Sequence, residues 1–373
     1  MKNSFFICLL IPFILSSCHP APSPKELLTS RLDSALTRIF PENEPGGSVF
    51  ISKGDEILYA RSFGLADLKT KNKFSDQTVA NLGSISKTFV AYGILILQNQ
   101  GKLSVEDPIG KYFPEFKNKA LAEKIKIKHL LMHTSGLPDC RKVDKDSIYY
   151  LTANDSENFH PLTLTDTLEF EPGTKWNYSN PAYNGLALII EKVSKMKWQK
   201  FIQENIFDPS GMKDSKITDG SFPDKGVAHG YRLVNKAYEE YDYGECPTFD
   251  AAGNGGVWSS IGDLRLYVKA IKAARFTDKA TIQRSETIHI PENWNLKDTL
   301  IHSEVWFVHP SIMDWYHDKE QCRVIEHNGD QGGFKAHLIM IPESDMTIIW
   351  LSNNDKFITN TLRKALFKVG FIK

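Results

Sequence analysis

Apolar side chains surround the axis of one predicted helix in the first third of the chain. The segment from Ile85 to Gln100 is apolar on all sides, through Ile85, Phe89, Val90, Tyr92, Ile94, Leu95, Ile96 and Leu97. A helix that is apolar all round is buried rather than laid on a surface. Gly101 suits the position just past a helix end. The pattern therefore predicts a buried helix over 85–100.

Strand patterns occur near both ends of the chain. The predicted strands are 47–52 and 57–63, around the turn 53–56, and then 303–308, 323–327, 334–341 and 346–351, with a turn at 342–345. Helical spacing frames them at 25–40 and 358–369. Between the two groups of strands, helical and loop signals dominate, with a strong helical run over 186–195 and a further helix that includes 203–206.

This order of elements predicts an α+β protein. We expect an antiparallel sheet domain built from residues 25–83 and 251–373, flanked by the N- and C-terminal helices. A mainly helical domain, residues 84–250, is inserted between its two halves. A cleft between two such units is a usual place for an active site, and Ser84 lies at the junction in sequence.

The first residues predict export and lipid attachment. Lys2 precedes an apolar run over 5–15, which is too short to span a bilayer, and Leu15-Ser-Ser-Cys18 follows it. This resembles a bacterial lipobox, so we expect a signal peptide over 1–17, lipid on Cys18 and a short tether over 18–24. Lipid chains would hold the protein on a membrane of the cell envelope without spanning it. An ordinary signal peptide with a chance cysteine is the alternative.

The charge balance argues against a nucleic-acid-binding protein, and the cysteine content leaves the disulfide pairing open. The 373 residues carry 45 basic and 45 acidic side chains, so no basic field favours nucleic acid. Hydrophobic content of 41% is that of a soluble globular protein. Besides Cys8 and Cys18, three cysteines remain, and sequence does not decide which two would pair: Cys140, Cys246 and Cys322.

Ser84 and Lys87 are the first candidates for chemistry. They lie three residues apart at the start of the buried helix, so they share one face near its N-terminus, where free backbone N–H groups favour negative charge. The same spacing recurs at Ser194/Lys197 and Ser210/Lys213. Both of those pairs fall in lysine-rich stretches that we interpret as solvated surface.

Two further motifs each occur once. Tyr178-Ser-Asn180 lies in a loop before the helix at 184–195, and His327-Asn-Gly329 ends a late strand. Taken separately, each could be structural: Tyr178 as a loop aromatic, Asn180 as a turn former and His327 as a strand-end residue. Their combination with Ser84/Lys87 favours a functional reading.

In this combination the chain resembles the serine β-lactamase and penicillin-recognising hydrolase superfamily. The match is to its class C-like branch of esterases and D-stereospecific peptidases, in which Ser-x-x-Lys, Tyr-x-Asn and Lys-Thr-Gly or His-x-Gly recur in this order. The stretches 130–138 and 253–264 are similar as well. The resemblance covers residues 25–373 and implies the same fold, an antiparallel sheet flanked by terminal helices with an inserted all-α domain.

The resemblance also implies roles. Ser84 would be the nucleophile that forms an acyl-enzyme, and Lys87 its base, because a serine hydroxyl needs a neighbour to take its proton. Tyr178 would carry a proton to the leaving group, and Asn180 would bind a substrate carbonyl or Lys87. The backbone N–H groups of Ser84 and Asp330, the residue after Gly329, would form the oxyanion hole. The implied substrate is an ester or an amide, including peptides that contain D-residues.

His327 departs from the true class C β-lactamases, which carry lysine there near the substrate carboxylate. Histidine is mostly neutral at pH 7, which disfavours penicillin hydrolysis. A penicillin-binding D-alanyl-D-alanine carboxypeptidase or β-lactamase remains an alternative, and so does a peptide-binding lipoprotein without turnover.

Other kinds of site have little support. No Cys-x-x-Cys, Gly-x-Ser-x-Gly or P-loop occurs. His129 and His133 are four apart but lack the adjacent glutamate of a metalloprotease, so we expect His133 to shape its own loop. We expect neither a metal nor a cofactor.

Overall fold

The computed structural model describes residues 21–139, 153–217, 226–241, 252–288, 290, 301–309 and 323–372. The signal peptide, Cys18 and most of the tether lie outside these ranges. Cys8, Cys140, Cys246 and Cys322 also lie outside the described residues, and so does any disulfide between them.

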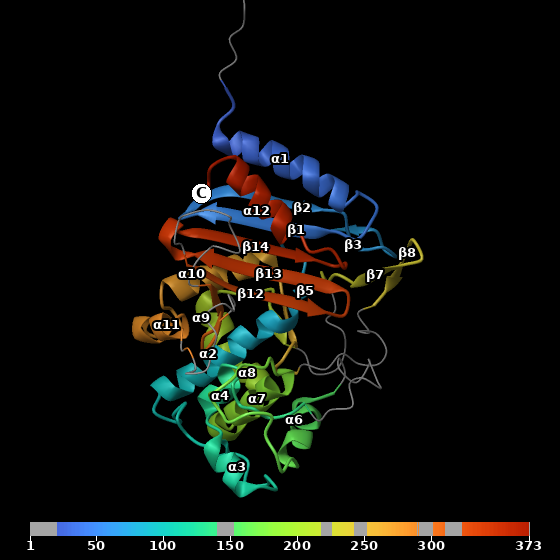
Figure 1. Cartoon of the computed structure of the whole chain (residues 1–373). Helices are drawn as coiled ribbons and strands as arrows, with labels where there is room; N and C mark the ends of the chain where they lie inside the picture. Colours follow the sequence, from blue (N-terminus) through green and yellow to red (C-terminus); the bar gives the residue numbers. More distant parts are fainter. Residues whose placement is uncertain are drawn as a thin grey trace, which may run out of the picture.

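A seven-stranded antiparallel sheet is assembled from both ends of the chain. Its strand order is β10-β11-β12-β13-β14-β1-β2 (Figure 1). The strands are β1 (Gly47–Lys53), β2 (Glu56–Phe63), β10 (Ile301–His302), β11 (Phe307–His309), β12 (Val324–Gln331), β13 (Phe334–Ile341) and β14 (Met346–Ser352). The pairing of β1 with β14, in the register Phe50↔Ile349, joins the N-terminal hairpin to the C-terminal strands. The predicted α+β fold is confirmed.

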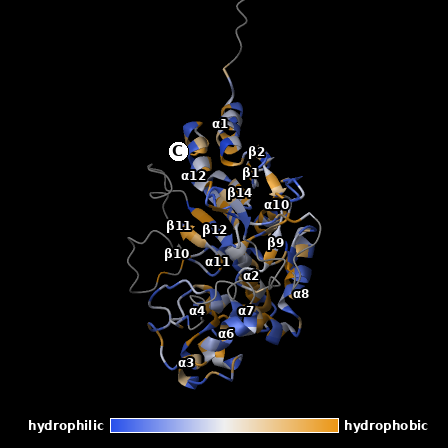
Figure 2. Cartoon of the chain, turned by 90° about the vertical axis from the view of Figure 1, so that its right-hand side faces the viewer, coloured by the Kyte–Doolittle hydropathy of each residue, from blue (hydrophilic) through white to orange (hydrophobic). Residues whose placement is uncertain are grey.

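The two terminal helices cover one face of this sheet. Helices α1 (Pro24–Ile39) and α12 (Thr359–Lys368) lie side by side above it in Figures 1 and 2. Leu28, Leu32 and Leu36 of α1 are fully buried there against strand side chains such as Trp350. The helical spacing of four residues between these leucines therefore marks the buried stripe.

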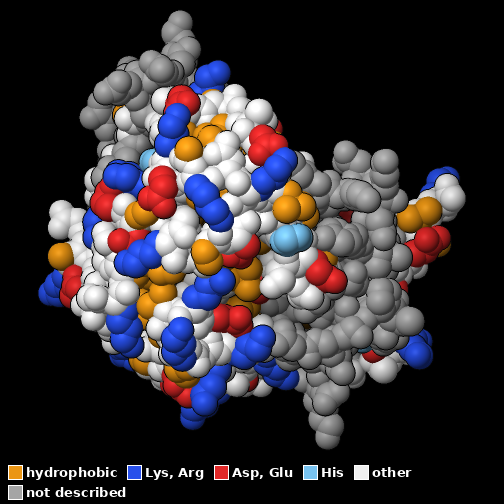
Figure 3. Space-filling model, turned by 90° about the horizontal axis from the view of Figure 1, so that it is seen from below, with side chains coloured by type: hydrophobic (Ala, Val, Ile, Leu, Met, Phe, Trp, Pro, Cys, Tyr) orange, Lys and Arg blue, Asp and Glu red, His pale blue; other side chains and the backbone are white. Residues whose placement is uncertain are grey.

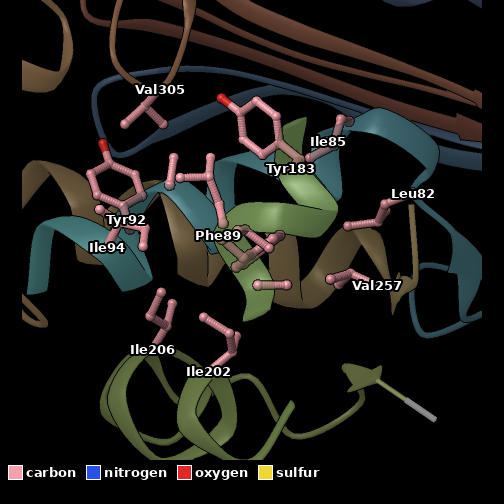
Figure 4. Close-up of a cluster of buried hydrophobic side chains, with 14 of the residues drawn as sticks. Leu82, Ile85, Phe89, Tyr92, Ile94, Tyr183, Ile202, Ile206, Val257 and Val305 are labelled. Carbon is pink, nitrogen blue, oxygen red and sulfur yellow. The ribbon is translucent and has the colours of Figure 1, made fainter. Parts of the chain in front are cut away.

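The buried helix is α2 (Ser86–Asn99), and it lies below the opposite face of the sheet. Every residue from Ser86 to Leu97 is buried. Figure 4 shows Phe89 among side chains from the neighbouring segments, including Tyr183, Ile202 and Val257. One apolar cluster thus joins the helices to the sheet, which holds the start of α2 rigidly in place.

The remaining elements lie mainly between β2 and β10 in sequence. The helices are α3 (Lys119–Lys124), α4 (Ile127–Leu131), α6 (Asp155–Thr163), α7 (Asn180–Ser194), α8 (Trp198–Ile202), α9 (Asp208–Ser210), α10 (Ile261–Lys272) and α11 (Lys279–Ser285). Shorter turns are η1 (Gly83–Ile85), η2 (Ile109–Lys111), η3 (Gln203–Phe207, a π-turn) and η5 (Pro342–Ser344). The short strands are β3 (Leu65–Asp67), β4 (Asn72–Lys73), β5 (Ala80–Asn81), β6 (Lys216–Ile217), β7 (Tyr231–Val234), β8 (Ala237–Glu240) and β9 (Val257–Ser259).

Two predicted strands were wrong in detail. The segment 303–308 is not one strand: Ser303 Oγ accepts the N–H of Trp306 at 2.9 Å and closes a turn between β10 and β11. A side-chain acceptor competes with the strand ladder in this way, although the local residues are apolar. The strand at 323–327 runs on to Gln331 as β12, so His327 and Gly329 lie inside a strand and not at its end.

The surface carries mixed charge. Figure 3 shows basic and acidic side chains interspersed on the face below the helices, without a large area of one sign. Within the described ranges, no helix is long and apolar enough to cross a membrane. The same ranges contain no group of histidine, cysteine and acidic side chains arranged to hold a metal ion.

Candidate active site

Ser84 lies in the turn η1 immediately before α2, one residue earlier than the predicted helix. A positive-φ glycine and two hydrogen bonds shape this turn. Gly83 has φ +51°, a value at which an L side chain is strained, and its N–H donates to Asn81 Oδ1 at 2.7 Å. Leu82 N–H donates to Val257 O at 2.9 Å. The turn is therefore tied to β9, and Ser84 stays half-buried at the edge of the core.

Lys87 is fully buried beside Ser84. Its Nζ lies 3.0 Å from Ser84 Oγ and 2.7 Å from the carbonyl oxygen of Asn254, to which it donates. Burial disfavours the charged form of an amine, while the Asn254 carbonyl orients it toward the serine. No motif marks Asn254 itself in the sequence, although it lies in the stretch 253–264 that resembles the family.

The other two Ser-x-x-Lys pairs are not arranged in this way. In the described structure neither has a hydrogen bond between serine and lysine. Lys197 instead pairs with Glu191 at 3.6 Å. The expectation that Ser210 lies on a solvated surface is wrong, because it ends α9 with only 1% of its surface exposed. Lys213, its partner in sequence, is exposed.

Tyr178 faces the lysine from the other side of the site. The centroid of its ring lies 5.1 Å from Lys87 Nζ, and the Tyr183 ring lies 5.8 Å from the same atom. Phe307 of β11 stacks near Tyr178 with centroids 6.3 Å apart. Tyr178, about ninety residues further along the chain, is thus brought to the Ser84–Lys87 pair.

Asn180 begins α7 and does not lie in the preceding loop. Ser179 accepts the N–H of Ala182 at 3.3 Å and caps the helix at that point, ahead of Pro181. Among the described residues, the buried Oδ1 of Asn180 has no hydrogen-bond partner. No Asn180–Lys87 hydrogen bond occurs in this part of the structure; the partners of Lys87 Nζ described above are Ser84 Oγ and Asn254 O.

β12 presses its backbone against the serine turn. A Cβ placed on Gly329 would lie 1.9 Å from Leu82 O and 3.3 Å from Ser84 N, and one on Gly83 would lie 2.6 Å from Asp330 N. Only glycine at both positions permits this approach. The two backbone N–H groups predicted as oxyanion donors therefore belong to segments in direct contact.

His327 is fully buried and neutral. Burial first, then the neighbouring His302 and Lys87, lowers the pKa of His327 well below its usual value. Its Nδ1 lies 2.8 Å from Asn328 O. A carbonyl can only accept, so Nδ1 carries the hydrogen and Nε2 presents a lone pair. The ring offers no positive charge to a carboxylate.

Two more histidines line this region. His302 is buried and its ring centroid lies 6.1 Å from that of His327; burial, outweighing its bond to Ser303 O, lowers the pKa of His302 to about 3. His133 stacks on Tyr178 with centroids 4.3 Å apart. His302 had no motif around it, so no sequence signal pointed to it.

The buried carboxylate of Asp155 holds the backbone next to Asn254. Asp155 Oδ1 accepts from Gly253 N and from Asn184 Nδ2, both at 2.8 Å. Burial raises the pKa of Asp155 to about 7, against the opposing effect of these hydrogen bonds.

Comparison with known proteins places the chain in a family. Residues 35–368, most of the chain, match the family described as Beta-lactamase. The chain belongs to the beta-lactamase family. Together with the assembled Ser84–Lys87 pair, this indicates a serine hydrolase of the β-lactamase and penicillin-binding-protein type.

Individual relatives are more distant. The chain is 28% identical over 347 residues to "Penicillin-binding protein 4*" of Bacillus subtilis (strain 168), covering 89% of this chain and 73% of that one. It is 25% identical over 324 residues to "Protein flp" of Staphylococcus aureus (strain MW2), covering 84% of this chain but only 61% of that protein. Among solved structures, D-amino acid amidase from Ochrobactrum anthropi SV3 superposes with TM-score 0.73 at 20% identity, covering 93% and 97% of the two chains. This last likeness shows the fold alone.

Proposed function

We propose that the protein hydrolyses an ester or an amide through an acyl-enzyme on Ser84. One observation carries the proposal: a fully buried Lys87 amine lies 3.0 Å from Ser84 Oγ, held by the Asn254 carbonyl. A serine with an adjacent, oriented base is the arrangement that nucleophilic catalysis needs.

The first half-reaction forms the acyl-enzyme. Neutral Lys87 takes the Ser84 proton while Oγ bonds to the substrate carbonyl carbon. The N–H groups of Ser84 and Asp330 stabilise the oxyanion. Collapse breaks the bond to the leaving oxygen or nitrogen, which receives the proton through Tyr178. Water then attacks the acyl-enzyme by the same route in reverse, releasing the acid and restoring Ser84.

Asn180 would orient the substrate from the opposite wall. Its amide can donate to the acyl-side carbonyl of the substrate. Its Oδ1, buried and without a partner among the described residues, can accept an N–H from an amide of the substrate that lies next to this carbonyl. Buried polar atoms are costly to leave unpaired, which supports a role in binding for this residue.

The neutral His327 favours substrates without a carboxylate next to the scissile bond. A buried imidazole that presents a lone pair would repel a carboxylate there. Neutral esters and amides, including derivatives of D-amino acids, meet this condition. The shared fold with a D-amino acid amidase is consistent with the D-amino-acid class.

A penicillin-binding carboxypeptidase is the second candidate. Its support is the 28% identity to a protein named as a penicillin-binding protein. Acylation of Ser84 by a labelled penicillin, followed by slow release, would favour it over an esterase.

We further propose that the protein is exported and held on a cell-envelope membrane by lipid on Cys18. The support is the sequence Leu15-Ser-Ser-Cys18 followed by the proline-rich stretch that reaches Pro24, where α1 begins. Metabolic labelling with a fatty acid, lost in Cys18→Ala, is the expected result. Equal labelling of both proteins would contradict it.

A turnover screen tests the activity. Short-chain p-nitrophenyl esters, D- and L-aminoacyl amides and a chromogenic cephalosporin are compared, with Ser84→Ala as the control. We expect turnover of neutral esters or amides that Ser84→Ala abolishes. Turnover that is equal in both proteins would contradict the proposal, and turnover confined to the cephalosporin would contradict the preference for substrates without a carboxylate.

A further inference from the structure

His133 contacts three consecutive residues of the Tyr178 segment. Its backbone carbonyl accepts the N–H of Asn177 at 2.9 Å, and its ring nitrogen Nδ1 accepts the N–H of Ser179 at 3.0 Å. Between these bonds, the ring itself lies against the Tyr178 ring, with centroids 4.3 Å apart and planes at 33°. One residue therefore fixes the backbone on both sides of Tyr178 and one face of its ring.

The surrounding backbone extends this attachment. Thr134 O accepts from Gly173 N, and Gly136 O accepts from Glu169 N, both at 2.8 Å. Backbone hydrogen bonds thus hold the segment from 169 to 179 alongside the loop that follows α4. The side chain of His133 reaches from this loop to Tyr178.

The conformation of His133 is itself unusual. Its φ is +57°, a region that few non-glycine residues adopt, and its side chain is 1% exposed. Asparagine would fit this backbone more easily and could supply an acceptor at the same place. It could not supply an aromatic face. An imidazole is the side chain that combines both functions, provided that it stays neutral so that Nδ1 can accept.

We propose that His133 is a positioning residue for Tyr178, which holds the tyrosine ring against Lys87 so that its hydroxyl can protonate the leaving group. His133 contacts neither Ser84 nor the bond that breaks, and it acts through Tyr178. The proposal rests on the proposed hydrolase function, in which Tyr178 transfers the proton.

Dependence on the leaving group distinguishes this role from a purely structural one. A p-nitrophenolate leaves without needing a proton, whereas an alkoxide or an amine must be protonated as it leaves. A displaced Tyr178 therefore slows alkyl esters and amides much more than p-nitrophenyl esters of the same acid. A general loss of folded protein would slow both to the same extent.

The test compares kcat/KM, which reports acylation, for a matched p-nitrophenyl and alkyl ester in wild type, His133→Ala, His133→Asn, Tyr178→Phe and the double variant His133→Ala/Tyr178→Phe. We expect His133→Ala to lower kcat/KM for the alkyl ester on the order of 100-fold, as for a catalytic group misplaced by about 1 Å. The loss for the p-nitrophenyl ester should be under about tenfold. His133→Asn, which keeps the acceptor for Ser179, should fall between wild type and His133→Ala.

The double variant is the decisive comparison. Because His133 acts through Tyr178, adding His133→Ala to Tyr178→Phe should cause no further change in the ratio of the two rates. His129→Asn is the matched control: His129 is also buried and its Nδ1 also accepts a backbone N–H, from Lys126 at 3.1 Å, but this bond caps α4. His129→Asn should lower the melting temperature without changing the ratio.

Two results would overturn the inference while leaving the hydrolase intact. One is an unchanged ratio of rates in His133→Ala. The other is an equal further change of the ratio in the Tyr178→Phe background. A wild-type protein that turns over neither ester, or whose turnover survives Ser84→Ala, would overturn the proposed function and this inference with it.

Discussion

Gly329→Ala probes the contact between β12 and the serine turn. An alanine Cβ at this position would lie 1.9 Å from Leu82 O, whereas ordinary contact begins near 3.4 Å. The strand or the turn must therefore move by about 1.5 Å, because the three nearest atoms all belong to the backbone of Leu82 and Ser84 and cannot rotate away. That movement separates Ser84 N from Asp330 N, the two proposed oxyanion donors.

The expected loss of kcat follows from the transition-state stabilisation that one oxyanion-hole donor supplies. Removal of a single oxyanion donor costs about 3 kcal/mol, or 10²–10³ in kcat. We expect Gly329→Ala to lower kcat by at least about 100-fold. KM should change little, because the donors act mainly on the charge that develops in the transition state.

The assay is kcat and KM for a p-nitrophenyl ester, with the melting temperature recorded for each variant. Gly262→Ala is the matched control. Its Cβ would meet nothing closer than 3.5 Å, and the residue lies in the first turn of α10. It should be fully active and at least as stable as wild type. Activity of Gly329→Ala within about threefold of wild type, at unchanged stability, would refute the oxyanion assignment.

Three further predictions follow from buried ionisable groups. The folded-state pKa of Asp155 is raised to about 7 from 3.8, so the folded protein binds more protons than the unfolded chain between these values. The free energy of unfolding should fall by up to about 4 kcal/mol as pH rises from about 4 to about 7. In urea titrations, Asp155→Asn should abolish this pH dependence. The same pH dependence in the variant and in wild type would contradict the prediction. Glu326 is buried, which raises its pKa, but His337 at 2.8 Å and His309 at 2.8 Å outweigh this and lower the pKa to about 2. The contribution of ionised Glu326 to the free energy of unfolding should be present above pH 4.5 and lost as pH falls toward 2. Glu326→Gln should therefore be less stable than wild type at neutral pH and lack this acid-dependent loss. A variant as stable as wild type at pH 7 would refute the assignment. His327→Lys should increase the rate of Ser84 acylation by a labelled penicillin relative to that by a neutral ester, by about tenfold for one new charge–carboxylate contact. If the ratio of these two acylation rates stays the same or falls, His327 does not decide carboxylate binding.

The sequence was informative where one local pattern decides the structure. The apolar surround of α2, the leucine spacing of α1 and the strands of the N-terminal hairpin were all predicted within a few residues. Ser84 and Lys87 could be selected because a buried helix follows them. Their contact needs only the spacing of one helical turn.

Long-range contacts decided the rest. Asn254 holds Lys87 through a backbone carbonyl, an interaction that any residue type could make, so its side chain gave no signal. His302 reaches the site because Ser303 closes a hairpin within an apolar stretch that had been interpreted as one strand. The extension of β12 through Gly329 depends on pairing with β13, which local propensity does not reveal.

The central claim is that Ser84, activated by Lys87, is the reactive serine. The most direct measurement is intact mass after incubation with a fluorophosphonate probe, for wild type, Ser84→Ala and Ser210→Ala. Ser210 is the matched control, because it has the same Ser-x-x-Lys spacing and is buried, but in the described structure it has no hydrogen bond to its lysine. We expect a single adduct on wild type and on Ser210→Ala, and none on Ser84→Ala. An unmodified wild type, or an equal adduct on Ser84→Ala, would contradict it.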